Sequence, residues 1–146
     1  MVQDRRFNMR ICFDLDNTLC TGKPYETAEP YSGIKEMLLR LKEAGHTIII
    51  YTARGMGTSS SNTGAAIANI GKLTLDQLES WDFVYDEIYF GKPNAELYID
   101  DKAYHASSIK KLESFIKRME NSNKQVGTYC SKIQSMISRI DKCTKE

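Results

Sequence analysis

The sequence predicts an α/β fold in which a parallel sheet lies between two layers of helices. Short apolar segments of strand length alternate along the chain with segments whose apolar residues recur at helical spacing. This alternation is typical of parallel sheets, whose strands are covered by helices and are therefore strongly apolar. The chain of 146 residues is long enough for one domain with a sizeable core.

The first part of the chain is expected to form two strands with a helix between them. Residues 9–14 (MRICFD) are a short apolar run that predicts a buried strand. Residues 32–46 (SGIKEMLLRLKEAGH) carry apolar residues at helical spacing, with Ser32 as the expected N-cap and Gly45 as the stop. Residues 46–52 (HTIIIYT) predict the second strand.

The next part is expected to add two more strands. Residues 54–71 are rich in Gly, Ser, Thr and Asn, which favours mainly a loop, with a short helical turn at Ala65–Ile70 as an alternative. Leu73–Trp81 suggests a helix with Thr74 as a candidate N-cap. The segments YDEIYF (85–90) and AELYID (95–100) predict the third and fourth strands.

The C-terminal part is predicted to be helical. Residues 105–120 place apolar side chains on one helical face, and residues 121–146 approximate a spacing of three to four over little more than two heptads. We therefore expect a core domain over residues 1–120 and a helical extension over residues 121–146. The extension either packs on the core or joins two copies of the chain in a homo-oligomer.

Composition excludes several broad classes of protein. The formal net charge is +1, which provides no general electrostatic attraction to nucleic acid or to an anionic membrane. The longest apolar runs are too short to span a bilayer, and the N-terminal residues do not form a secretory apolar region. The four cysteines show no metal-binding spacing. We expect a cytoplasmic protein with free thiols, and with Cys12 in the core.

Polar residues follow several of the predicted strands. Asp14, Thr52, Lys92 and Asp100 each lie at or just beyond the carboxyl end of a separate predicted strand. Ligands of parallel sheets bind at this edge. The sequence therefore predicts that these residues converge on one site.

These residue types suit phosphoryl transfer. Carboxylates gathered at one edge need a compensating cation, and hard oxygen ligands favour Mg²⁺. Lys92 adds a positive charge and Thr52 a hydroxyl donor, both suited to phosphoryl oxygens. An aspartate can then act as a nucleophile, while a second carboxylate two residues away transfers protons.

Four short motifs carry a resemblance to the haloacid dehalogenase superfamily of phosphohydrolases. Residues 14–18 (DLDNT) are similar to its first motif, and Thr52 in YTAR to its second. Lys92 in FGKP is similar to the third motif, and the pair Asp100–Asp101 after LYI to the fourth. The motifs occur in the family's order, over residues 9–103. The resemblance implies a Rossmann-like core with a parallel sheet.

The resemblance also implies roles for individual residues. Asp14 would be the nucleophile and a Mg²⁺ ligand, and Asp16 the general acid/base, with its backbone carbonyl on the metal. Thr52 and Lys92 would hold the phosphoryl oxygens. One or both of Asp100 and Asp101, directly or through water, would complete the metal site. The substrate is further expected to contact three residues near these motifs: Asn17, Ala53 and Arg54.

The segments between the motifs bear on the substrate. Family members often select substrates with a cap domain, but residues 19–31 are too short for one, and residues 53–91 hold elements that the core needs. We therefore expect a chain with no large cap domain and an open site. The segments IIIYTAR, NIGK, YDEIYFGKP and YIDDKA resemble short capless phosphatases of capsule and polysaccharide biosynthesis. That implies a phosphorylated small molecule or glycan, such as a sugar phosphate, as substrate.

Other interpretations of the same residues remain open. A phosphomutase or phosphotransferase would use the same scaffold, and a non-catalytic protein would bind a phosphorylated ligand. A phosphorylated signalling receiver is disfavoured because its acidic pair precedes the phosphorylated aspartate, whereas here the pair comes last. Arg54 and Lys72 are interpreted as exposed surface charges, with substrate contact as the alternative. The loop over residues 54–71 is a candidate lid.

Overall fold

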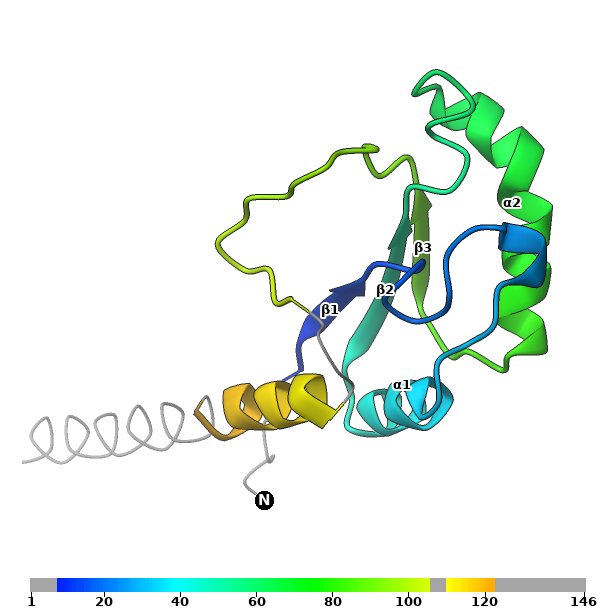
Figure 1. The fold of residues 1–146 in the computed structure, drawn as a ribbon. Coiled ribbons are helices and arrows are strands. Elements are labelled where there is room, and N and C mark those ends of the chain that lie inside the picture. The colour runs from blue at the N-terminus through cyan, green and yellow to red at the C-terminus, as the bar shows by residue number, and fades with distance from the viewer. Residues whose placement is uncertain (1–7, 106–109, 123–146) are drawn as a thin grey trace, which may run out of the picture. The chain divides into compact units, whose positions relative to one another are not determined.

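The computed structural model describes residues 8–105 and 110–122 (Figure 1). By its internal contacts the chain divides into two compact units, which are described separately. The unit Asn8–Ile109 contains the sheet and every residue expected at the site. In the other unit residues 110–122 are helical, as predicted. The predicted extension lies, apart from its first two residues, outside the described residues, and the domain boundary at residue 120 stays a prediction.

A parallel sheet of three strands forms the centre of the first unit. The strands are β1 (Arg10–Phe13), β2 (Thr47–Thr52) and β3 (Glu87–Phe90), and they are arranged in chain order. Phe13 pairs with Ile50, which in turn pairs with Ile88, so one apolar row crosses the sheet. The three strand predictions and the parallel α/β fold class are confirmed.

Two helices connect the strands. Helix α1 (Ile34–Glu43) joins β1 to β2, and α2 (Thr63–Ser80) joins β2 to β3. Consecutive right-handed crossovers place both helices on the same face of a sheet, and Figure 1 shows them on one side. Their apolar residues cover the sheet face that carries Phe13, Ile48 and Ile50, all of which are buried. The second helical layer, on the opposite face, stays a prediction.

Helix α1 confirms the predicted spacing but not the predicted cap. Of its five predicted apolar positions, Ile34, Met37, Leu38 and Leu41 are buried, whereas Ala44 is the C-cap and is partly exposed. The N-cap is Gly33, with φ 84°, rather than Ser32. The backbone N–H of Ile34 donates to the Tyr31 carbonyl, so a backbone turn leads into the helix without a side-chain cap. Gly45 ends the helix region with φ 94°, as expected of a C-terminal glycine.

Helix α2 is much longer than the sequence indicated. It begins at Thr63, where the side chain of Asn62 accepts a hydrogen bond from the Ala65 N–H. The predicted loop over residues 54–71 is therefore wrong beyond residue 62, because three alanines in GAAIANIG support a helix despite the flanking glycines. Thr74 lies inside the helix and is not its N-cap. Whether the shorter loop closes over the site stays a prediction.

The predicted fourth strand is absent among the described residues. Residues 95–100 form an irregular segment, and Leu97 and Ile99 are 72% and 91% exposed. Strand composition indicates a segment that fits a half-buried pleated surface, but it does not supply the partner strand. Cys12 is likewise exposed rather than in the core, because it lies on the sheet face opposite α1 and α2.

The connections between the strands agree with the prediction of a chain without a large cap domain. The connection from β1 to α1 holds only turns and the short 3-10 helix η1 (Tyr25–Thr27). The connection from β2 to β3 consists of a short loop and α2. None of the described helices is long and apolar enough to cross a membrane.

Candidate active site

Three of the four predicted strand ends meet at one edge of the sheet. Asp14 follows β1, Thr52 ends β2, and Lys92 follows β3 after Gly91. The ammonium group of Lys92 donates to Asp14 Oδ1 at 2.8 Å, and the Lys92 backbone N–H donates to the Thr52 carbonyl at 3.1 Å. Parallel strands in register bring these residues together, as the strand-end argument predicted.

Both oxygens of the Asp14 carboxylate receive a hydrogen bond. Lys92 contacts Oδ1, and the hydroxyl of Thr18 donates to Oδ2 at 3.1 Å. The side chain of Asp14 is 33% exposed, so a ligand can approach it. Thr18 was assigned no role from the sequence. Its contact arises from the turn after β1, in which the Leu19 N–H donates to the Leu15 carbonyl at 2.8 Å.

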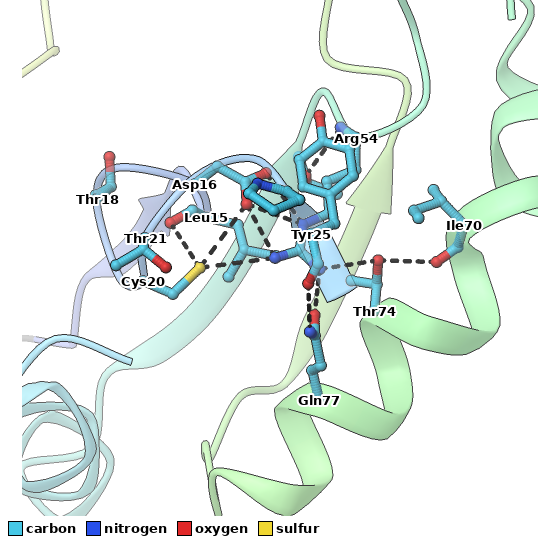
Figure 2. A network of polar contacts seen from close by, with 12 residues as sticks. Leu15, Asp16, Thr18, Cys20, Thr21, Tyr25, Arg54, Ile70, Thr74 and Gln77 are labelled. Atoms are coloured by element: carbon cyan, nitrogen blue, oxygen red, sulfur yellow. Dashed lines mark hydrogen bonds and ion pairs between the residues drawn. The ribbon is translucent and has the colours of Figure 1, made fainter. Parts of the chain in front are cut away.

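Asp16 is bound by the guanidinium group of Arg54, as Figure 2 shows. Arg54 Nε lies 3.0 Å from Oδ1 and 3.1 Å from Oδ2, and Nη2 lies 2.9 Å from Oδ1. The Arg54 side chain is fully buried, while that of Asp16 is 18% exposed. A guanidinium group buried without a partner would lower the stability of the fold by about 3–5 kcal/mol. The Asp16 carboxylate therefore largely offsets the cost of burying Arg54.

The far side of Arg54 contacts polar groups of α2. Nη1 donates to Gln77 Oε1 at 2.7 Å and to Thr74 Oγ1 at 3.3 Å. The ring of Tyr25 covers the guanidinium group, with its centroid 4.9 Å from Cζ. All three guanidinium nitrogens therefore have protein partners. The prediction that Arg54 is a solvent-exposed charge is wrong, and direct contact between Arg54 and a substrate would require these bonds to open.

The residues that enclose Arg54 were missed from the sequence. Thr74 and Gln77 lie on the buried stripe of α2 that also contains Ala66 and Leu78. Two hydrogen-bonding side chains within an apolar stripe indicate a buried polar partner, since buried polar groups are almost always satisfied. The stripe spans Ala66 to Leu78, so it belongs to a helix that begins at Thr63 and is only partly contained in the predicted helix Leu73–Trp81.

Cys20 and Tyr25 complete the surroundings of Asp16. The Cys20 thiol contacts Asp16 Oδ1 at 3.8 Å and the Leu15 carbonyl at 3.6 Å. Burial, reinforced by the negative charge of Asp16, raises the pKa of the Cys20 thiol to about 12. Burial also raises the pKa of the Tyr25 hydroxyl, again with a contribution from Asp16. Both groups are therefore neutral at physiological pH.

The remaining predicted substrate contacts lie in different environments. Asn17 is exposed in the turn after β1, with φ 61°, and its backbone N–H donates to the Cys20 carbonyl. Thr52 is fully buried, and its Oγ1 accepts from the Arg54 backbone N–H at 3.1 Å. Ala53, which lies between Thr52 and Arg54 in the chain, is partly exposed. Lys72, expected on the surface, is exposed and pairs with Asp76.

Asp100 and Asp101 do not join the other predicted metal ligands. Both are exposed in the irregular segment after β3, where Asp100 Oδ1 accepts from the Lys102 N–H. The described residues contain no group of three acidic, His or Cys side chains that could hold a metal ion. Asp14 and Asp16 are suitable oxygen donors for Mg²⁺, but two carboxylates held by Lys92 and Arg54 are not a complete site.

Comparisons with known proteins show the fold. No family model and no curated protein matches the chain. One solved structure, the crystal structure of an MCSG target from Vibrio cholerae, matches with a TM-score of 0.62 and 26% sequence identity. The match covers 77% of this chain and 98% of that one. This similarity agrees with the small α/β fold of the first unit.

Proposed function

We propose that the protein is a phosphohydrolase that acts through an aspartyl-phosphate formed on Asp14. The observation that carries the proposal is the 2.8 Å contact between Lys92 and Asp14 at the carboxyl edge of the sheet. A partly exposed carboxylate beside a fixed ammonium group can attack an anionic phosphoryl group, since the cation offsets the repulsion between them. The second carboxylate, Asp16, lies two residues away.

The chemistry follows from the two carboxylates. The Asp14 carboxylate attacks the phosphorus of a phosphate monoester, and the bond from phosphorus to the leaving oxygen breaks. Asp16, which enters this step in its protonated form, donates its proton to that oxygen and becomes a carboxylate. Water then attacks the aspartyl-phosphate, and Asp16 takes a proton from this water. The bond between phosphorus and the Asp14 oxygen breaks, which releases inorganic phosphate, restores the Asp14 carboxylate and leaves Asp16 protonated for the next cycle. Lys92 interacts with the phosphoryl oxygens throughout.

Mg²⁺ and the substrate class are part of the same proposal. A bound Mg²⁺ would be held by the Asp14 carboxylate and the Asp16 backbone carbonyl and would neutralise phosphoryl charge, with Asp100 or Asp101 completing the set after the segment of residues 91–105 rearranges. The substrate is a phosphorylated small molecule or glycan, such as a sugar phosphate. An open site without an inserted domain supports a substrate of this kind, because it leaves room for groups beyond the phosphate.

The test is phosphate release from sugar phosphates, nucleotides and an aryl phosphate, with Mg²⁺ or with EDTA. We expect Mg²⁺-dependent release by the wild type. Asp14→Asn should lower it by at least about a thousandfold, because the amide cannot act as the nucleophile. Asp76→Asn is the matched control, since Asp76 is exposed on α2 and pairs with Lys72; it should retain wild-type activity.

Mass spectrometry of acid-quenched wild type should detect one added phosphoryl group on the peptide that contains Asp14. Full activity in Asp14→Asn would disprove the proposed nucleophile. Phosphate release that is unaffected by EDTA would disprove the metal requirement. A wild type that hydrolyses nothing but binds phosphorylated ligands would favour the non-catalytic alternative.

A further inference from the structure

We infer that Arg54 is a positioning residue that holds Asp16 so that one carboxylate oxygen faces the reaction. This inference rests on the proposed function and assigns a task to a residue buried outside the substrate's reach. Arg54 has no exposed surface, and each of its guanidinium nitrogens has a protein partner. Its effect on the reaction is therefore exerted through Asp16.

The contacts distinguish the two oxygens of Asp16. Oδ1 accepts from Arg54 Nε and Nη2, at 3.0 and 2.9 Å, and also contacts the Cys20 thiol. Among the contacts that the structure describes, Oδ2 accepts only the longer bond from Nε, at 3.1 Å. Figure 2 shows these bonds converging on the carboxylate. We assign proton transfer to Oδ2, because it retains more unused lone-pair capacity.

The guanidinium group also connects Asp16 to two other elements. Gln77 accepts from Nη1 through Oε1 and donates through Nε2 to the Tyr25 carbonyl at 2.6 Å. The Tyr25 ring in turn covers Arg54. One side chain of α2 thus fixes both the arginine and η1, and an arginine held on three sides keeps the carboxylate in a single orientation. A planar fork suits this task better than a flexible ammonium group.

A positioning role predicts a dependence on the leaving group. An alkyl phosphate needs its leaving oxygen protonated, whereas p-nitrophenyl phosphate has a leaving group that departs readily without a proton. Displacing Asp16 should therefore impair hydrolysis of the alkyl ester much more than hydrolysis of the aryl ester. A purely structural role of Arg54 would lower both rates equally. The quantity to compare is kcat/KM, which reports transition-state stabilisation relative to free enzyme and substrate.

The experiment measures kcat/KM for two substrates: a sugar phosphate, which is the alkyl ester, and p-nitrophenyl phosphate, which is the aryl ester. The proteins compared are wild type, Arg54→Lys, Asp16→Asn and the variant that carries both changes. We expect Arg54→Lys to lower the value for the alkyl ester by about tenfold or more beyond its effect on the aryl ester. In the Asp16→Asn background the Arg54→Lys change should have no further leaving-group effect. Arg10→Lys is the matched control, because Arg10 makes a bidentate contact with Glu87 while its own side chain is 61% exposed.

Gln77→Leu provides a second, uncharged route to the same effect if Arg54→Lys does not fold. It removes the shorter of the two hydrogen bonds from Nη1 and leaves the longer one to Thr74 and the ion pair with Asp16. It should therefore shift the alkyl-to-aryl ratio in the same direction by a smaller factor. Equal losses on both esters in folded variants would overturn the positioning role while leaving the phosphatase assignment intact. Absence of hydrolysis by the wild type would instead overturn the proposed function, and the inference with it.

Discussion

Arg54 and Arg10 show how surroundings decide what one side chain does. Both make close contacts with a carboxylate, Arg54 with Asp16 and Arg10 with Glu87. Arg10 is exposed, so solvent screens its ion pair, and we expect that pair to contribute little to stability. Arg54 is enclosed, so removing its partner Asp16 would leave a buried charge unpaired and would strongly destabilise the fold. The sequence-based interpretation of Arg54 as an exposed charge is wrong because its burial depends on partners from distant segments, Asp16 and Gln77.

The residues at the strand ends were more predictable than the residues that support them. Asp14 and Lys92 could be placed because each follows an apolar run of strand length, and parallel strand ends meet at one edge. Their contact at 2.8 Å agrees with that argument. Arg54 and Gln77 meet only through the packing of α2 against the site, which no local pattern encodes.

Gly91 is the residue whose backbone most constrains the site. Its φ is 89°, and an added Cβ would lie 2.6 Å from Thr63 Oγ1. We expect Gly91→Ala to lower the free energy of unfolding by about 1–3 kcal/mol, because the new methyl group combines backbone strain with a clash. Phosphate release should fall too, since Lys92 is the next residue. Urea denaturation and the phosphate assay measure the two effects.

The control for this substitution is Gly57→Ala. There an added Cβ would approach the end of a flexible side chain, Asn94 Nδ2 at 3.3 Å, from a backbone outside the left-handed region. This variant should keep nearly wild-type stability. Similar losses in both variants would show that the Gly91 geometry is not the cause.

Among the elements, those with strong periodicity were predicted and those that depend on a partner were not. The run IIIY predicted β2, and the apolar stripe predicted α1, in which four of the five expected positions are buried. The segment AELYID has the same strand composition as β3, yet it is irregular. A strand needs a neighbour with free backbone groups, and the sequence of the segment says nothing of that neighbour.

Asp86 connects three elements through one carboxylate. Its Oδ2 accepts from the Ile48 N–H of β2 at 2.7 Å, its Oδ1 pairs with Lys42 of α1, and its own chain enters β3. The bond from Lys42, followed by that from Ile48, lowers the pKa of Asp86 below its usual value. The stabilisation is therefore complete above the unfolded-state pKa, about 3.9, and is lost as the pH falls through the lower folded-state value.

We expect Asp86→Asn to lower the Tm at pH 7, and the difference from wild type to shrink as the pH falls below about 4. Thermal unfolding followed by circular dichroism across this range measures the effect. Asp82→Asn is the control, since Asp82 makes an exposed ion pair with Lys35 and should have little influence at any pH. A difference in Tm for Asp86→Asn that stays constant down to acidic pH would contradict the electrostatic explanation.

For the whole molecule, the segment of residues 91–105 is the part that the proposed activity would have to change. It exposes Leu97 and Ile99, and it leaves Asp100 and Asp101 apart from Asp14 and Asp16. If these carboxylates complete a Mg²⁺ site, Mg²⁺ with inorganic phosphate should slow amide hydrogen exchange across residues 95–101. Mass spectrometry of the exchanged peptides measures this.

The double variant Asp100→Asn/Asp101→Asn should abolish that protection while leaving exchange in β2 unchanged. Unaltered exchange across residues 95–101, at Mg²⁺ concentrations at which calorimetry detects binding, would contradict a role for the acidic pair. It would leave Asp14 and Asp16 as the ligands to test next.

The arrangement of the strands also bears on how the protein is made. The spatial order β1-β2-β3 repeats the order of the chain, so β2 pairs with β1 and β3 pairs with β2. During synthesis on the ribosome each new strand can therefore add to a partner that has already emerged. Asp16 and Arg54 could pair before β3 is translated, and Lys92 would arrive last. Asp14 would therefore gain its contact with the Lys92 ammonium group only after β3 has joined the sheet.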